Sequence, residues 1–141
     1  MRQTIWLACA ALAALVPAAV QAQDSSFLSA NLYGDAVPGG GDDNASGDFN
    51  GEVFPASGRV CYYLDLLDLR NPTGAAIHHG AEGDEGDVVI ELQLPAAEGE
   101  ETCVEADPAV VAQVLASPAD YYVQVNSRRN SGGALRGQLS E

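Results

Sequence analysis

The two histidines are the first candidates for chemistry in this sequence. His78 and His79 are adjacent, within a run of small and apolar residues. If that run is a strand, neighbouring side chains point to opposite faces, so the two imidazoles cannot act together. We expect His78 to be a buried or edge residue that is hydrogen-bonded to backbone or to Asn126, with a weak metal contact as the alternative. We expect His79 to face solvent.

The segment that begins at Asp42 partly matches a calcium-binding loop. Its oxygen-bearing side chains include Asp42, Asn44 and Asp48, which follow the spacing of ligands in an EF-hand. The match ends at the twelfth position, where Val53 replaces the bidentate glutamate. The flanking residues also have the pattern of strands. We therefore expect a solvated turn, with weak calcium binding as the alternative.

A second acidic segment, residues 82–87, crowds four carboxylates into six positions. Like charges this close repel one another, and a divalent cation held by Asp84 and Asp87 would relieve the repulsion. Weak calcium binding at the acidic loops is therefore favoured over copper or zinc near His78. No other cofactor is expected.

The cysteines indicate a disulfide. Of three in the sequence, Cys61 and Cys103 lie beyond the first 22 residues. An even pair in an exported domain is typical of a bridge. Closing a loop of about 43 residues would stabilise the fold by roughly 4 kcal/mol in the chain-entropy model. Metal binding is the rival interpretation, although two isolated cysteines supply only half of a usual zinc site.

The sequence contains no recognisable set of catalytic residues. Nucleophilic catalysis needs an activated serine or cysteine beside a base, and the sequence has no Gly-x-Ser-x-Gly motif and only the adjacent histidine pair. The carboxylate pair of a glycosidase cannot be recognised among 20 acids by spacing. We therefore expect a protein that is not an enzyme.

The first 22 residues have the pattern of a secretory signal. Arg2 is followed by an apolar run over residues 5–16, by Pro17, and by small residues before a predicted cleavage after Ala22. The run is shorter than the ~20 apolar residues that span a bilayer. We expect export to the periplasm or beyond the cell, no membrane insertion after cleavage, and a mature domain at 23–141.

Composition restricts the partners. The 141 residues include 20 acids against 6 arginines and no lysine, for a formal charge of -14. Such a charge repels nucleic acid and anionic membranes. We expect a monomer with an unknown protein or surface partner.

Alternation of apolar and polar residues dominates the mature chain, as in half-buried strands. The clearest one-faced sets are Val60, Tyr62, Leu64 and Leu66; Val88, Ile90, Leu92 and Leu94; and Tyr121, Val123 and Val125. Tyr63 and Tyr122 fall on the opposite faces and are the exposed aromatics expected to offer a binding surface. The other expected strands cover residues 27–33, 47–54, 75–79, 102–105 and 134–139. The set predicts an antiparallel Greek-key β-sandwich or barrel.

One segment has helical spacing instead. Asp107 suits an N-cap, Pro108 suits the first helical position, and apolar residues follow at helical intervals until Ser117-Pro118. We expect one short helix that covers an open edge or end of the sandwich.

Several motifs, taken in order, resemble one known family. They are Leu32-Tyr33-Gly34, the strand that carries Cys61, residues 75–81 with His78 and Gly80, residues 121–127, and residues 132–139 with Arg136 and Gly137. Nearly the whole mature chain is thereby similar to the CHRD family, the chordin-type domain found as a single secreted unit in bacteria. The resemblance is consistent with the all-β fold, of an immunoglobulin-like or superoxide-dismutase-like type.

Two departures from the family pattern bear on function. Ala76 and Asn126 stand where members usually have histidines, and only His78 remains of three. Members with all three could hold a transition metal on one face of the sheet, whereas this chain lacks two of those ligands. Arg136 of the closing motif is expected to pair with a carboxylate, Asp65 or Asp87.

We therefore expect an exported, non-enzymatic CHRD module with a structural or recognition role. The alternative is a metal-binding protein.

Overall fold

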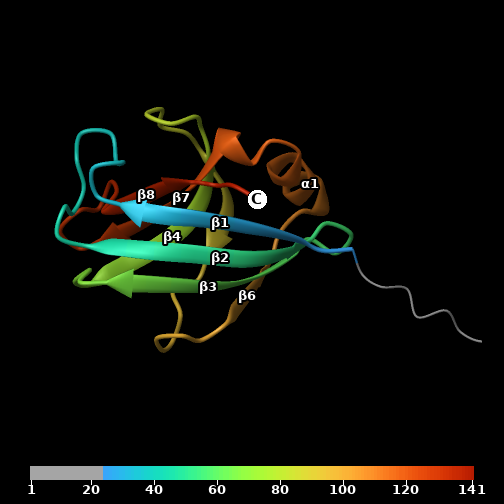
Figure 1. Cartoon of the computed structure of the whole chain (residues 1–141), viewed down its shortest axis with the longest axis horizontal. Coiled ribbons are helices and arrows are strands. Elements are labelled where there is room, and N and C mark those ends of the chain that lie inside the picture. The colour runs from blue at the N-terminus through green and yellow to red at the C-terminus, as the bar shows by residue number, and fades with distance from the viewer. Residues whose placement is uncertain (1–23) are drawn as a thin grey trace, which may run out of the picture.

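The structure, a computed structural model, describes residues 24–141 of the chain. These residues contain eight antiparallel strands and one short α-helix (Figure 1). The elements are β1 (Ser26–Tyr33), β2 (Ser46–Phe54), β3 (Arg59–Leu67), β4 (Pro72–His79), β5 (Val88–Leu92), β6 (Thr102–Glu105), α1 (Pro108–Ala116), the 3₁₀ turn η1 (Pro118–Asp120), β7 (Tyr121–Ser127) and β8 (Leu135–Gln138). The all-β antiparallel fold with one short helix is confirmed. The expected signal segment and its cleavage after Ala22 lie outside the described residues.

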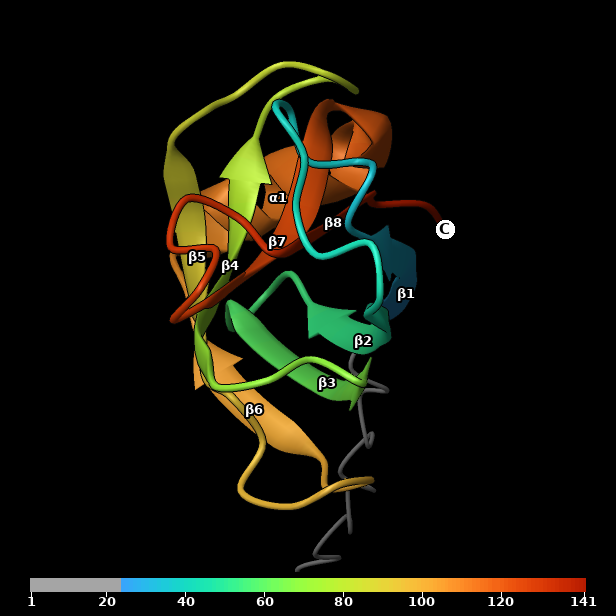
Figure 2. The ribbon, with the colours of Figure 1, turned by 90° about the vertical axis from the view of Figure 1, so that its left-hand side faces the viewer.

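The strands form two halves that face each other across a core (Figure 2). Their order is β5-β4-β7-β8-β1-β2-β3-β6, which makes β5 and β6 the edges. β8 and β1 join the halves through the pair Tyr33 and Arg136 and the bridge between Ser29 and Ser140. Gly137 permits this close approach, because a Cβ at that position would lie 2.1 Å from the carbonyl oxygen of Asn31.

Inward-facing side chains of both halves fill the core. The alternation expected for β3 and β7 is confirmed, with their predicted core faces buried or partly buried. The core includes Leu28, Ala30, Leu32, Phe49, Val53, Val60, Tyr62, Leu64, Ile77, Ile90, Leu92, Val123, Val125 and Leu135. Tyr62 also crosses the core, since its hydroxyl donates to the carbonyl oxygen of Gln93 at 2.7 Å and accepts from the Gln93 amide at 2.7 Å. Burial raises the pKa of Tyr62.

The face predicted for Val88 is wrong. Ile77 pairs with Ile90, but the next residue, His78, pairs with Val88, so Val89 is the extra residue of a β-bulge. The bulge reverses the alternation beyond it. Val89 therefore packs against the core, and Val88 is exposed.

The predicted helix forms where its sequence signals place it. Asp107 caps α1 by accepting a hydrogen bond from the amide of Ala109 at 2.8 Å, and Pro108 is the first helical residue. Val111 and Val114 are buried in the core, so α1 covers one end of the sandwich (Figure 1). No helix within residues 24–141 is long and apolar enough to cross a membrane.

The predicted disulfide between Cys61 and Cys103 is present. The two residues pair directly across β3 and β6, with their Cα atoms 4.0 Å apart. The bond links the four-residue edge strand β6 to β3. Because both sulfur atoms are in the disulfide, neither cysteine is a free thiol that could bind zinc.

Candidate functional site

Arg136 holds the acidic loop 80–87 against the sheet. Its side chain is buried, with Nη1 donating to the carbonyl oxygen of Asp84 at 2.6 Å and Nη2 to that of Ala81 at 2.8 Å. Nη2 also donates to Oε1 of Gln138 at 3.2 Å. The carboxylate partner expected for Arg136 is wrong, because these acceptors are backbone carbonyls and an amide. The candidate Asp65 lies instead on β3, opposite Asp48.

An aromatic stack extends from the guanidinium. The carbon Cζ of Arg136 lies 3.4 Å from the ring centroid of Tyr122. On β4, the ring of His78 stacks on Tyr122 with centroids 4.9 Å apart and an angle of 9°. Tyr122 is buried, so its expected exposure is wrong. The loop covers the outer side of β7, and the Gly86 amide donates to the Tyr122 hydroxyl at 3.1 Å.

His78 is partly buried and is hydrogen-bonded to the backbone, which was one of the two partners expected for it. Its Nδ1 lies 2.9 Å from the carbonyl oxygen of Gly86. Asn126 is not its partner, since that residue pairs with Gly74 at the other end of β4 and accepts from Gln124. His79 is exposed, as predicted. We call Arg136, Tyr122, His78 and Gln138 the arginine clamp.

Gly80 and Gln138, also in the family motifs, position the start of the same loop. The Gly80 amide donates to the carbonyl oxygen of Asp120 at 2.7 Å, and Nε2 of Gln138 donates to that of Gly80 at 3.0 Å. Gly137 lies at the seam between β8 and β1. Of the family-motif residues, His78, Gly80, Arg136 and Gln138 thus position the loop 80–87, and their polar atoms bond to the protein itself.

The segment that begins at Asp42 does not have the geometry of an EF-hand loop. Oδ1 of Asp42 accepts a hydrogen bond from the amide of Asn44 at 3.2 Å, within a turn. From Ser46 onward the chain is extended in β2, so Asp48 lies on a strand, paired with Asp65 and not folded back toward Asp42. An extended segment cannot wrap its alternate side chains around one ion, as an EF-hand loop does.

The second acidic loop lines an open hollow of about 660 Å³. Asp84, Glu85 and Asp87 contribute to it together with Asp120 from η1. Within residues 24–141, however, no three or more His, Cys, Asp or Glu side chains are arranged to hold a metal ion. Calcium binding at Asp84 and Asp87 therefore stays a prediction from charge crowding.

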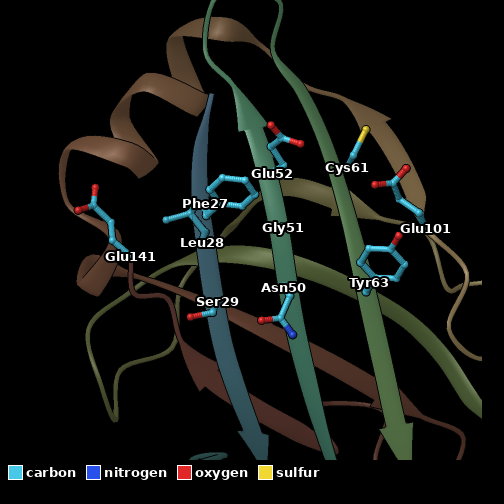
Figure 3. Close-up of a pocket in the computed structure, with 10 residues that line it drawn as sticks. All are labelled: Phe27, Leu28, Ser29, Asn50, Gly51, Glu52, Cys61, Tyr63, Glu101 and Glu141. Carbon is cyan, nitrogen blue, oxygen red and sulfur yellow. The ribbon is translucent and has the colours of Figure 1, made fainter. Parts of the chain in front are cut away.

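A different hollow, of about 260 Å³, lies on the outer face of β1, β2 and β3 (Figure 3). Phe27 and Tyr63 stand on either side of it, with Gly51 between them on the central strand. A complete lining set adds neighbouring residues of these strands and of two chain segments beside them: Leu28, Ser29, Asn50, Glu52, Cys61, Glu101 and Glu141.

The same face gathers exposed apolar side chains. Of five large apolar residues exposed in the described part of the chain, four lie on it: Phe27 at 68%, Leu67 at 65%, Tyr33 at 52% and Tyr63 at 44%. Tyr33 and Leu67 share one row, because both pair with Ser46. Tyr63 was predicted to be exposed, whereas the other three were missed. The alternation of Leu28, Ala30 and Leu32 as core residues would have revealed Phe27 and Tyr33.

The fold and the clamp define a class of protein, an antiparallel β-sandwich cross-linked by one disulfide and closed over one side by an arginine-held loop. The chain belongs to the CHRD domain family, whose model matches residues 28–139. That match confirms the resemblance carried by the sequence motifs. No curated protein and no solved structure gives a significant match.

Proposed function

We propose that this chain is an exported CHRD domain that acts as a recognition module, without enzymatic chemistry, and that its working surface is the outer face of β1, β2 and β3. The observation that carries the proposal is that four exposed apolar side chains lie on this one face, two of them, Phe27 and Tyr63, lining its hollow and two, Tyr33 and Leu67, lying further along it. Exposed apolar patches of this kind mark interaction sites in soluble proteins.

The arginine clamp supports the same assignment by a different route. The guanidinium of Arg136 is buried against two carbonyls and an aromatic ring, and Nδ1 of His78 is bonded to Gly86. A group engaged in this way would have to break those bonds before it could bind a substrate. The clamp is therefore assigned an architectural role.

Export accounts for the disulfide and the charge. A disulfide persists in the periplasm or outside the cell, and a lysine-free, acidic surface keeps an exported domain soluble. N-terminal sequencing of the exported protein should begin at Gln23. Retention of residues 1–22 in the exported protein would contradict this part of the proposal.

The double substitution Tyr63→Ser with Leu67→Ser tests the working surface. Native gel filtration of the culture medium and of detergent-solubilised envelope should show the wild-type protein in a complex and the double variant as a free domain. Val88→Ser is the matched control, because Val88 has the same exposed fraction as Tyr63, 44%, but lies on edge strand β5. Identical elution of the wild type and the double variant would contradict the proposal.

A further inference from the structure

We infer that the outer face of β1, β2 and β3 binds an extended basic segment of a partner protein, with an arginine or lysine side chain seated between Phe27 and Tyr63. The inference rests on the proposed function and specifies the chemistry of the partner.

The hollow combines the two features that recognise an organic cation. Phe27 and Tyr63 present ring surfaces, and the ring quadrupole attracts a cation placed over the face of the ring. Three acidic residues, Glu52, Glu101 and Glu141, are also among the residues that line it. Glu52 is held in place, since its Oε1 accepts from the hydroxyl of Ser25 at 2.7 Å. No arginine or lysine is among the residues that line this hollow.

One arginine, Arg59, lies on this face and already has contacts within the protein. Arg59 lies on β3 two residues before Cys61 and therefore on the same side of the sheet. Its Nη2 lies 3.6 Å from Sγ of Cys103, and its Cζ lies 5.8 Å from the ring centroid of Phe54. The guanidinium thus lies between Phe54 of β2 and Cys103 of β6, and Arg59 is not among the residues that line the hollow.

Negative charge continues along the face from the hollow. Asp48 and Asp65 pair with each other across β2 and β3, and both are exposed. Beyond them lies the apolar row of Tyr33 and Leu67. Phe27 and Tyr33 are six residues apart on β1, which is about 20 Å in a strand. A segment of about six extended residues covers that distance, whereas a small cation would fill only the hollow.

Charge excludes the other occupants. A neutral sugar would take these carboxylates out of water without providing a counter-charge, which is costly. An anionic ligand would be repelled, and a second copy of this chain would bring a second acidic face against the first. A basic segment with alternating apolar residues supplies both the counter-charge and the contacts that Tyr33 and Leu67 require.

Calorimetry with the purified exported protein tests the inference. The probe is a hexapeptide of alternating Arg and Leu, blocked at both ends. The comparison ligands are the same peptide with Glu in place of Arg, arginine amide, and a neutral glucose hexamer. We expect the basic peptide to bind, to weaken several-fold as salt screens the carboxylates, and to bind more tightly than arginine amide. We expect the acidic peptide and the sugar not to bind.

Matched variants locate the binding. Tyr63→Ala should weaken the basic peptide about fivefold or more, and Glu101→Gln about twofold or more. The controls Val88→Ala and Glu85→Gln change residues that are exposed but lie away from the outer face of β1, β2 and β3, and they should leave the affinity unchanged. All four positions are exposed, so thermal unfolding should confirm that each variant is folded.

The outcomes separate the inference from the proposed function. Binding of the acidic peptide or the sugar, lost in Tyr63→Ala, would overturn the basic partner but leave the outer face as the working surface. Arginine amide binding as tightly as the peptide would overturn the extended segment. Absence of basic-peptide binding, or binding insensitive to Tyr63→Ala and Glu101→Gln, would overturn the inference altogether.

Discussion

The positive charge of Arg136 is stabilised by carbonyl dipoles and an aromatic ring. Hydrogen bonds from a charged donor are stronger than neutral ones. The two carbonyls belong to the loop 80–87, so this buried side chain, together with Tyr122, His78 and Gln138, holds a segment with little apolar content of its own. This explains why the arginine of the closing motif is buried rather than presented to a ligand.

Arg136→Gln should therefore loosen the loop and lower the free energy of unfolding by roughly 3 kcal/mol. Urea denaturation measures the change, and amide exchange should show faster exchange at Gly86, whose amide bonds to the Tyr122 hydroxyl. Arg129→Gln is the control, because Arg129 is exposed. Equal stability of the two variants would contradict the clamp.

Tyr62 gives the fold a dependence on alkaline pH. Burial raises its pKa in the folded protein above the usual tyrosine value. The folded state therefore keeps the proton more tightly, so this contribution to stability is complete below about pH 10 and is lost as pH rises toward the raised pKa. Tyr62→Phe should remove that part of the alkaline loss, while costing roughly 1 kcal/mol at pH 7 through the hydrogen bonds to Gln93.

Urea denaturation at pH 7 and at pH 11 measures the Tyr62 contribution. Tyr63→Phe is the control, since Tyr63 is its exposed neighbour on β3. An unchanged pH dependence in Tyr62→Phe would show that burial of this hydroxyl does not matter for alkaline stability.

At the scale of elements, the seam between β8 and β1 depends on a missing side chain. Gly137→Ala would place a Cβ 2.1 Å from the Asn31 carbonyl oxygen, so the strands would have to separate. We expect a loss of roughly 3 kcal/mol or more, measured by urea denaturation. Gly74→Ala in β4 has open space around its Cβ and should change stability by less than about 1 kcal/mol. Equal effects of the two substitutions would contradict a tight seam.

The elements were largely predictable from the sequence, and the exceptions have physical causes. Period-two alternation located the strands, and Asp107-Pro108 located α1 because capping is a local property. The bulge at Val89 was not predictable, since it depends on how β5 pairs with β4. Tyr122 was assigned to solvent because strand alternation does not reveal that a distant loop covers the second face.

The candidate site was less predictable than the fold. Composition marked the histidines and acids, whereas the exposed face of β1, β2 and β3 becomes visible only when three strands are placed side by side. Tyr63 was found from its register on a single strand. Tyr33 and Leu67 form one row because both pair with Ser46 on the strand between them. The alternation of residues along a single strand does not reveal such pairing between strands.

At the scale of the whole molecule, the excess of acidic charge predicts weak calcium binding. Repulsion within residues 82–87 should be relieved by calcium at millimolar concentration, which raises the melting temperature by about one or two degrees. Asp84→Asn with Asp87→Asn should abolish the rise. A melting temperature that is the same with calcium and with chelator would contradict this prediction.

The central claim is that partners meet the outer face of β1, β2 and β3 and not the clamped loop. Its most direct test places a photoreactive amino acid at positions 63, 67, 84 and 88 in turn, with irradiation of the producing cells. Residues at all four positions are exposed. The account predicts one recurring adduct, identified by mass spectrometry, at positions 63 and 67 and absent at 84 and 88. Adducts at position 84 without any at 63 or 67 would contradict it.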